Sequence, residues 1–142
     1  MNDFYPLIAA LLAMILSQII KIFIFSKDSI KNNYRSLFGS GGMPSSHTAM
    51  VLALSTSLYI QDGLKSHTFF ISIIFSLIVL YDAMGVRKEV GKHSVFLNHL
   101  STLKKDKEDN VEFSEAIGHT FFEVFIGGVL GVVTATLLYL MI

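Results

Sequence analysis

The chain has 142 residues, of which 52% are hydrophobic and 15% are charged, compared with about 25% charged residues in an average soluble domain. A mean hydropathy of +0.59 places it among membrane proteins and excludes an ordinary soluble domain. Basic and acidic residues number 11 each, so the formal net charge is zero, and we expect no nucleic-acid partner. Cysteine is absent, which excludes disulfides and thiol chemistry. This length predicts one membrane-embedded domain over residues 1–142.

The first apolar segment covers residues 4–25, close to the length of about 20 residues that a spanning helix requires. The three residues before it include no basic residue, and no small-residue cleavage site follows. We therefore expect a retained span rather than a signal peptide. Ser17, Gln18 and Lys21 interrupt the segment on one face of the predicted helix.

Three further apolar segments follow at residues 45–61, 67–86 and 119–142. The segment 45–61 is the shortest, and its length also fits a re-entrant or tilted helix. Residues 87–118 form a charged stretch, in which apolar side chains on one face predict a helix along the membrane interface. These apolar residues are Val90, Phe96, Leu97, Leu100 and Leu103. The sequence thus predicts an all-α integral membrane bundle of about four transmembrane helices plus an interfacial cytoplasmic helix.

The basic residues are distributed unevenly between the two sides of this bundle. With four spans, the segments 26–44 and 87–118 lie on the same side, and nine of the 11 lysines and arginines fall in them. The positive-inside rule makes that side cytoplasmic and places both termini outside. We therefore expect a multi-pass protein of the cell membrane.

Ionisable residues occur at the cytoplasmic end of every predicted span. His47 and His119 begin the second and fourth spans from that side. Lys21 lies near the end of the first span, and Asp82 and Arg87 lie at the end of the third. Ionisable groups at membrane depth are energetically costly and are functional candidates. Their common level predicts a single site, facing the cytoplasm, in which two imidazoles meet across a pocket lined by cations.

His119 and Glu123 are one helical turn apart, so the carboxylate of Glu123 is placed to accept from the imidazole and fix its tautomer. The same stripe continues through Gly127, Gly131 and Ala135. Small residues at this spacing let helices approach closely, so we expect this face to point into the bundle. The alternative is that His119 only caps or anchors a helix at the level of the lipid headgroups.

A glycine-rich turn precedes His47, and the run reads Gly41-Gly42-Met43-Pro44-Ser45-Ser46-His47. Ser45 or Ser46 is a good N-cap for the following helix. The unpaired N–H groups and the positive end of the helix dipole favour an anion such as phosphate, with Gly42 nearby. In the alternative interpretation this run is only a turn and a serine-capped helix, and His47 has no role.

The remaining candidates each have a simpler alternative. Lys21 is also placed to extend its amine to the interface. Asp82 and Arg87 are also placed to neutralise each other, and Arg35 to attract anionic headgroups. Metal binding by His47, His119 and Glu123 is not expected, because no dense set of carboxylates accompanies them.

These motifs resemble those of the type 2 phosphatidic acid phosphatase and vanadium haloperoxidase superfamily, specifically a small divergent membrane branch of it. Pro44-Ser45-Ser46-His47 is similar to the superfamily's Pro-Ser-Gly-His motif, and His119-x3-Glu123 is similar to the end of its third motif, His-x3-Asp. Tyr81 to Arg87 and the glycine-rich run before His47 resemble the divergent branch itself. Asp28 and Phe113 occupy the positions at which the first and third motifs carry arginine. The resemblance covers about residues 17–131.

The resemblance implies a phosphatase that hydrolyses a lipid phosphate or diphosphate monoester without a cofactor, through a phosphohistidine. His119 is the implied nucleophile, Glu123 orients it, and His47 is the acid and base. Asp82 is a supporting residue, and the expected phosphate ligands include Lys21 and the N–H groups around Gly42, Ser45 and Ser46. Arg35 and Arg87 are expected to substitute for the arginines that the first and third motifs lack.

Two other classes of function fit the same sequence. One is a non-catalytic module that binds or transports a lipid or anion and keeps the phosphate site. The other is a membrane subunit whose charged segment 104–115 recruits a soluble partner. In each case the chain contacts membrane lipids, and the small residues Gly127 and Gly131 fit a homodimer contact.

Overall fold

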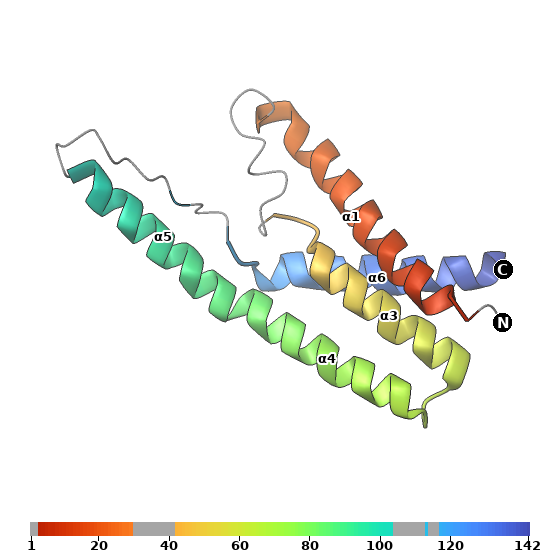
Figure 1. The fold of residues 1–142 in the computed structure, drawn as a ribbon. Helices are drawn as coiled ribbons and strands as arrows, with labels where there is room; N and C mark the ends of the chain where they lie inside the picture. Colours follow the sequence, from red (N-terminus) through yellow and green to blue (C-terminus); the bar gives the residue numbers. More distant parts are fainter. Residues whose placement is uncertain (1–2, 30–41, 104–112, 114–116) are drawn as a thin grey trace.

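The computed structural model describes residues 3–29, 42–103, 113 and 117–142 (Figure 1). In these residues the regular secondary structure is all helical: α1 (Tyr5–Ser29), α3 (Ser46–Asp62), α4 (His67–Met84), α5 (Val86–Leu103) and α6 (Phe121–Met141). The protein is an all-α membrane bundle, which confirms the predicted fold class. The start of α1 and the end of α6 lie at the same end of the bundle (Figure 1).

Three helical stretches are long and apolar enough to cross a membrane: Tyr5–Ile24, His67–Ser101 and Phe121–Met141. They correspond to three of the four predicted spans. The remaining helix, α3, has 17 residues with serine and threonine at residues 55–57, and it packs against α1, α4 and α6. Figure 1 shows α3 among these helices. A helix enclosed by other helices meets protein rather than lipid, so it needs fewer large apolar side chains. That α3 also crosses the membrane stays a prediction.

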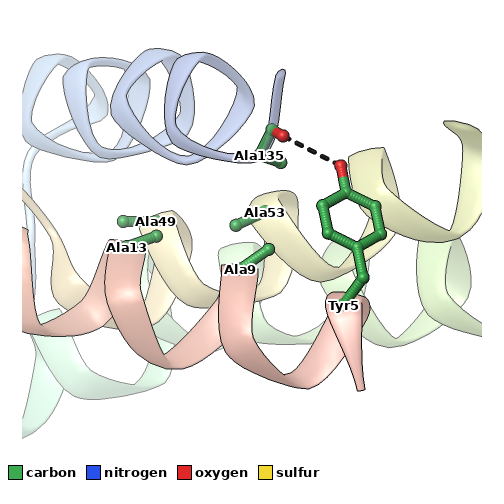
Figure 2. Packing of buried hydrophobic residues seen from close by; sticks show 6 residues of the cluster. All are labelled: Tyr5, Ala9, Ala13, Ala49, Ala53 and Ala135. Atoms are coloured by element: carbon green, nitrogen blue, oxygen red, sulfur yellow. Dashed lines mark hydrogen bonds between the residues drawn. The ribbon is translucent and has the colours of Figure 1, made fainter. Parts of the chain in front are cut away.

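The centre of the bundle is built from small side chains. Figure 2 shows Ala9 and Ala13 of α1 facing Ala49 and Ala53 of α3, and all four are fully buried. In a membrane there is little hydrophobic force between helices, so small residues stabilise their association by letting backbones approach closely. At one end of this cluster the hydroxyl of Tyr5 donates a hydrogen bond of 2.8 Å to the carbonyl of Ala135, which joins α1 to α6.

The glycines of α6 pack directly on the backbone of α3. A Cβ atom at Gly127 would lie 2.5 Å from the carbonyl oxygen of Ser45, and one at Gly131 would overlap the carbonyl oxygen of Ala49. The expectation that this stripe points into the bundle is confirmed. This face is occupied by α3 of the same chain, so it does not provide the homodimer contact that the sequence suggested. Whether the protein dimerises elsewhere stays untested.

A helix is present in the charged stretch as α5, but it begins immediately after α4 rather than as a separate element, and its position along the membrane interface stays a prediction. Only Gly85 interrupts the helical run, and Figure 1 shows α5 continuing in the direction of α4. The apolar side chains of α5, among them Val90, Phe96 and Leu97, are exposed. Asn98 of α5 forms two hydrogen bonds of 2.9 Å with the backbone N–H and carbonyl of Phe113.

The close approach of α3 and α6 leads to a stability prediction. Replacing Gly131→Ala places a methyl group against backbone, which has no room to move, and we expect the free energy of unfolding to fall by about 1–3 kcal/mol. Gly128→Ala is the matched control, because its methyl group would meet side chains rather than the backbone of α3: the flexible end of Leu52 at 2.7 Å and the methyl group of Thr48 at 3.8 Å. The measurement is unfolding of the detergent-solubilised variants. Equal stability of Gly131→Ala and the unsubstituted protein would show that the two helices do not pack this closely.

Candidate active site

Two backbone hydrogen bonds join the helix ends at which the predicted site residues lie. The N–H of Ser45, before α3, donates to the carbonyl of Glu123 in α6 at 3.2 Å. The N–H of His119, before α6, donates to the carbonyl of Ala83 at the end of α4 at 3.0 Å. The starts of α3 and α6 therefore meet the end of α4 at one end of the bundle, away from the start of α1 (Figure 1).

The turn before His119 depends on glycine. Gly118 has a φ angle of +94°, which residues with a side chain rarely adopt, and a Cβ atom there would lie 2.6 Å from the Cα of Lys88. This contact seats the turn directly on the first residues of α5. The backbone of His119 is thereby placed beside the junction of α4 and α5, which also carries Arg87.

His119 is buried beside the first turn of α6, with 4% of its surface exposed. Its Nδ1 atom lies 3.4 Å from Oε2 of Glu123, which is within ion-pair range but longer than a well-formed hydrogen bond. Within the part of the chain that the structure describes, this Nδ1 has no hydrogen-bond partner. Burial lowers the pKa of His119 from 6.5, and the carboxylate of Glu123 opposes part of that shift. Burial thus favours the neutral form of the imidazole.

Glu123 has a second role that the sequence analysis did not identify. Its Oε2 accepts the N–H of Thr120 at 2.8 Å, and the Thr120 hydroxyl accepts the N–H of Glu123 at 3.3 Å. This reciprocal pair is a capping box, which satisfies two N–H groups at the start of α6. The signal was present in the sequence as Thr-x-x-Glu before an apolar run. The same carboxylate therefore both caps α6 and approaches the imidazole of His119.

Lys21 of α1 and His47 of α3 are the next site residues, and both lie near His119 and Glu123. The side chain of Lys21 is only 4% exposed, so it points into the bundle rather than extending to the surface. It interacts electrostatically with Glu123, with His119 and with His47. His47 is exposed in the first turn of α3, and it interacts electrostatically with His119. His119 thus lies within electrostatic range of Lys21 and His47, which come from two distant parts of the sequence, and of Glu123 in its own segment.

Arg87 and Asp82 form an ion pair across the junction of α4 and α5. The Nε of Arg87 donates to Oδ2 of Asp82 at 2.5 Å, and both side chains are half-exposed. The alternative in which these residues neutralise each other is therefore realised in part. Because the bond uses Nε, the two terminal NH2 groups of the guanidinium still carry four donors. Both residues also interact electrostatically with His47.

The glycine-rich turn brings three further candidates to the start of α3. Gly42 has a φ angle of +87°, and Ser45 is the N-cap by its extended backbone, but its hydroxyl accepts from Thr48 at 2.9 Å rather than capping the helix. The hydroxyl of Ser46 is buried and has no hydrogen-bond partner among the described residues. The first backbone hydrogen bond of α3 runs from the N–H of Ala49 to the carbonyl of Ser45. The N–H groups of residues 46–48 therefore have no partner within the helix.

Other positions singled out in the sequence contribute less. Arg35 lies outside the described residues, so its part in the site is untested. Phe113, which stands where the superfamily has arginine, is exposed and held by Asn98 on α5. In the described residues no three histidine, aspartate or glutamate side chains are arranged to hold a metal ion.

The sequence matches one protein family over most of its length. The model of the Divergent PAP2 family matches residues 3–134. The chain is also 36% identical over 147 residues to "Uncharacterized membrane protein YuiD" of Bacillus subtilis (strain 168), and the match covers 94% of this chain and 93% of that protein. No solved structure matches it. The resemblance inferred from the histidine motifs is confirmed, and the chain belongs to the Divergent PAP2 family.

Proposed function

We propose that this protein is a membrane phosphatase that hydrolyses a lipid phosphate or diphosphate monoester through a phosphohistidine intermediate. The proposal rests on His47, His119 and buried Lys21, which interact electrostatically with one another at one end of the bundle. Membership of the Divergent PAP2 family supports the same class of reaction. In this proposal the site faces the cytoplasm of the cell, in accord with the basic residues of the adjoining segments.

His119 is the nucleophile of the proposed reaction. With a proton on Nδ1, facing Glu123, the lone pair of Nε2 is free to attack phosphorus. A bond forms between Nε2 and phosphorus while the bond to the ester oxygen breaks. His47 in its protonated form donates a proton to the leaving oxygen. Its exposure at the start of α3 gives it access both to that oxygen and to water.

The second step releases phosphate and restores both histidines. Neutral His47 removes a proton from water, the water oxygen bonds to phosphorus, and the bond between phosphorus and Nε2 breaks. Throughout, Lys21, Arg87 and the N–H groups around Ser46 stabilise the charge on the phosphoryl oxygens. Asp82 orients Arg87 through their ion pair. Charge stabilisation and positioning supply most of the catalysis in reactions of this type.

We expect the replacement of His119 and the replacement of His47 to affect the reaction differently. His119→Asn should abolish phosphoenzyme formation, since no nucleophile remains. His47→Asn should slow turnover by about 10²–10⁴-fold, the usual contribution of a general acid and base, and should let a phosphoenzyme accumulate from a substrate with a good leaving group. The measurement is release of inorganic phosphate from a panel of lipid phosphates, together with acid-labile phosphate on the protein.

The control for both variants is His67→Asn, because His67 is an exposed residue at the opposite end of α4. It should keep the activity of the unsubstituted protein. Phosphate attached to the His119→Asn protein, or full turnover by it, would eliminate the proposed nucleophile.

The pKa of His119 predicts the pH dependence of the first step. The attacking imidazole must be neutral, and burial lowers its pKa from 6.5, so the acidic limb of phosphoenzyme formation should lie below pH 6.5. Glu123 raises this pKa, so Glu123→Gln should move the limb to still lower pH. Single-turnover rates measured against pH test both statements. A limb that moves upward in Glu123→Gln would mean that the titrating group is not His119.

A second candidate is a protein that binds a phosphorylated lipid without hydrolysing it. It is favoured by Phe113, which leaves the site without the arginine that the superfamily carries there, and by the partial neutralisation of Arg87. Under this alternative, His119→Asn would leave phosphate binding largely intact, and the unsubstituted protein would release no phosphate.

A further inference from the structure

An apolar groove runs along the bundle between α4 and α6, and its volume is about 410 Å³. This volume lies within the range of ligand sites in proteins. The groove is lined by Leu52 of α3, by Leu80 and Met84 of α4, and by a longer set of residues on α6: Phe121, Val124, Phe125, Gly128, Val129, Val132 and Val133. Apart from Gly128, which has no side chain, every residue of this lining has an apolar side chain.

The groove exists because α4 and α6 both pack on α3 but touch each other only narrowly. Leu52 and Gly128 lie opposite each other where α3 and α6 meet, and a Cβ atom at Gly128 would lie 2.7 Å from the Leu52 side chain. The absence of a side chain at Gly128 therefore keeps room at the base of the groove. Phe125 and Val129 stand partly exposed beside it.

One end of the groove lies at the proposed phosphate site. Met84 directly follows Ala83, whose carbonyl holds the backbone of His119. Val124 directly follows Glu123, whose carboxylate approaches the imidazole of His119. The apolar lining thus begins within one residue of the two contacts that position His119.

We propose that this groove holds the hydrocarbon chain of a phosphorylated lipid, which enters from the bilayer between α4 and α6. The charges support this occupant rather than a second protein helix. The cations Lys21 and Arg87 lie at one end and favour an anionic headgroup, and the apolar walls favour a hydrocarbon chain attached to it. An amphiphile with an anionic head matches both parts. This inference adds a binding site for the hydrocarbon chain to the proposed phosphatase, and its hydrolytic test rests on that function.

The first test narrows the groove without touching the headgroup site. Val129→Phe adds bulk at the groove, and Leu137→Phe is the matched control on the lipid-facing surface of the same helix. The two substrates are a long-chain alkyl phosphate and a short, water-soluble aryl phosphate. Val129→Phe should lower kcat/KM for the long-chain substrate by about tenfold or more and change that for the short one by less than about twofold. Leu137→Phe should change neither.

An equal loss of kcat/KM for both substrates, no loss for the long-chain substrate, or the same selective loss in Leu137→Phe would overturn the proposal.

A second measurement does not depend on hydrolysis. The unsubstituted protein is irradiated with a long-chain alkyl phosphate that carries a diazirine at mid-chain, and the labelled residues are mapped by mass spectrometry. Labelling should concentrate on groove residues such as Leu80 and Val129.

Competition identifies the headgroup requirement in the same experiment. An unlabelled alkyl phosphate should suppress the labelling, and an uncharged alcohol of equal chain length should not. Labelling spread evenly over lipid-facing residues such as Leu137, or equal suppression by the alcohol, would overturn the groove assignment. If the protein releases no phosphate but labelling is specific, the groove assignment stands and the hydrolytic function fails.

Discussion

The contact between α6 and α3 is the constraint on which the rest of the structure depends. Gly127 and Gly131 let the backbone of α6 lie directly on that of α3, and the N–H of Ser45 then reaches the carbonyl of Glu123. In lipid the hydrophobic effect does little to join helices, so this close packing and its hydrogen bonds have to stabilise the pair. The same contact fixes the relative positions of the segments that carry His47 and His119.

The second element of the site is its attachment to α4. Gly118 lets the chain before α6 rest on the start of α5, and the carbonyl of Ala83 holds the backbone of His119. Because α4 and α6 meet only narrowly, the remainder of the two helices leaves room for the apolar groove. A single arrangement of helices therefore places a cationic, histidine-bearing end and an apolar groove side by side. This is the combination that a phosphorylated lipid requires.

Much of this arrangement was predictable from particular residues. The apolar segments predicted four helices, of which three are long and apolar enough to cross a membrane. The stripe of Gly127, Gly131 and Ala135 predicted which face of α6 is buried, because small residues at that spacing let helices approach closely in a membrane. Ser17 and Lys21 were predicted to share one face of α1, and both are buried in the structure. Periodic patterns of this kind are readable because each depends on the identity of the side chains.

Other features carried little or no readable signal. Nothing in the sequence shows that the carbonyl of Ala83 accepts from His119, since any residue supplies a carbonyl. The direct continuation of α4 into α5 was not predicted, because Gly85 and the charged residues after it are typical of a break between helices. The capping role of Glu123 was readable from Thr120, but the pairing of the same carboxylate with His119 drew the interpretation away from it.

The central claim is that an anionic phosphoryl group is held between His47 and His119. An experimental structure determined with orthovanadate tests it most directly, because vanadate takes the geometry of a phosphoryl group under attack. The account predicts vanadium bonded to Nε2 of His119, with His47 on the opposite side and the amine of Lys21 and the guanidinium of Arg87 on its oxygens. Vanadate bound away from both histidines, or imidazoles that point away from each other around an empty centre, would contradict the account.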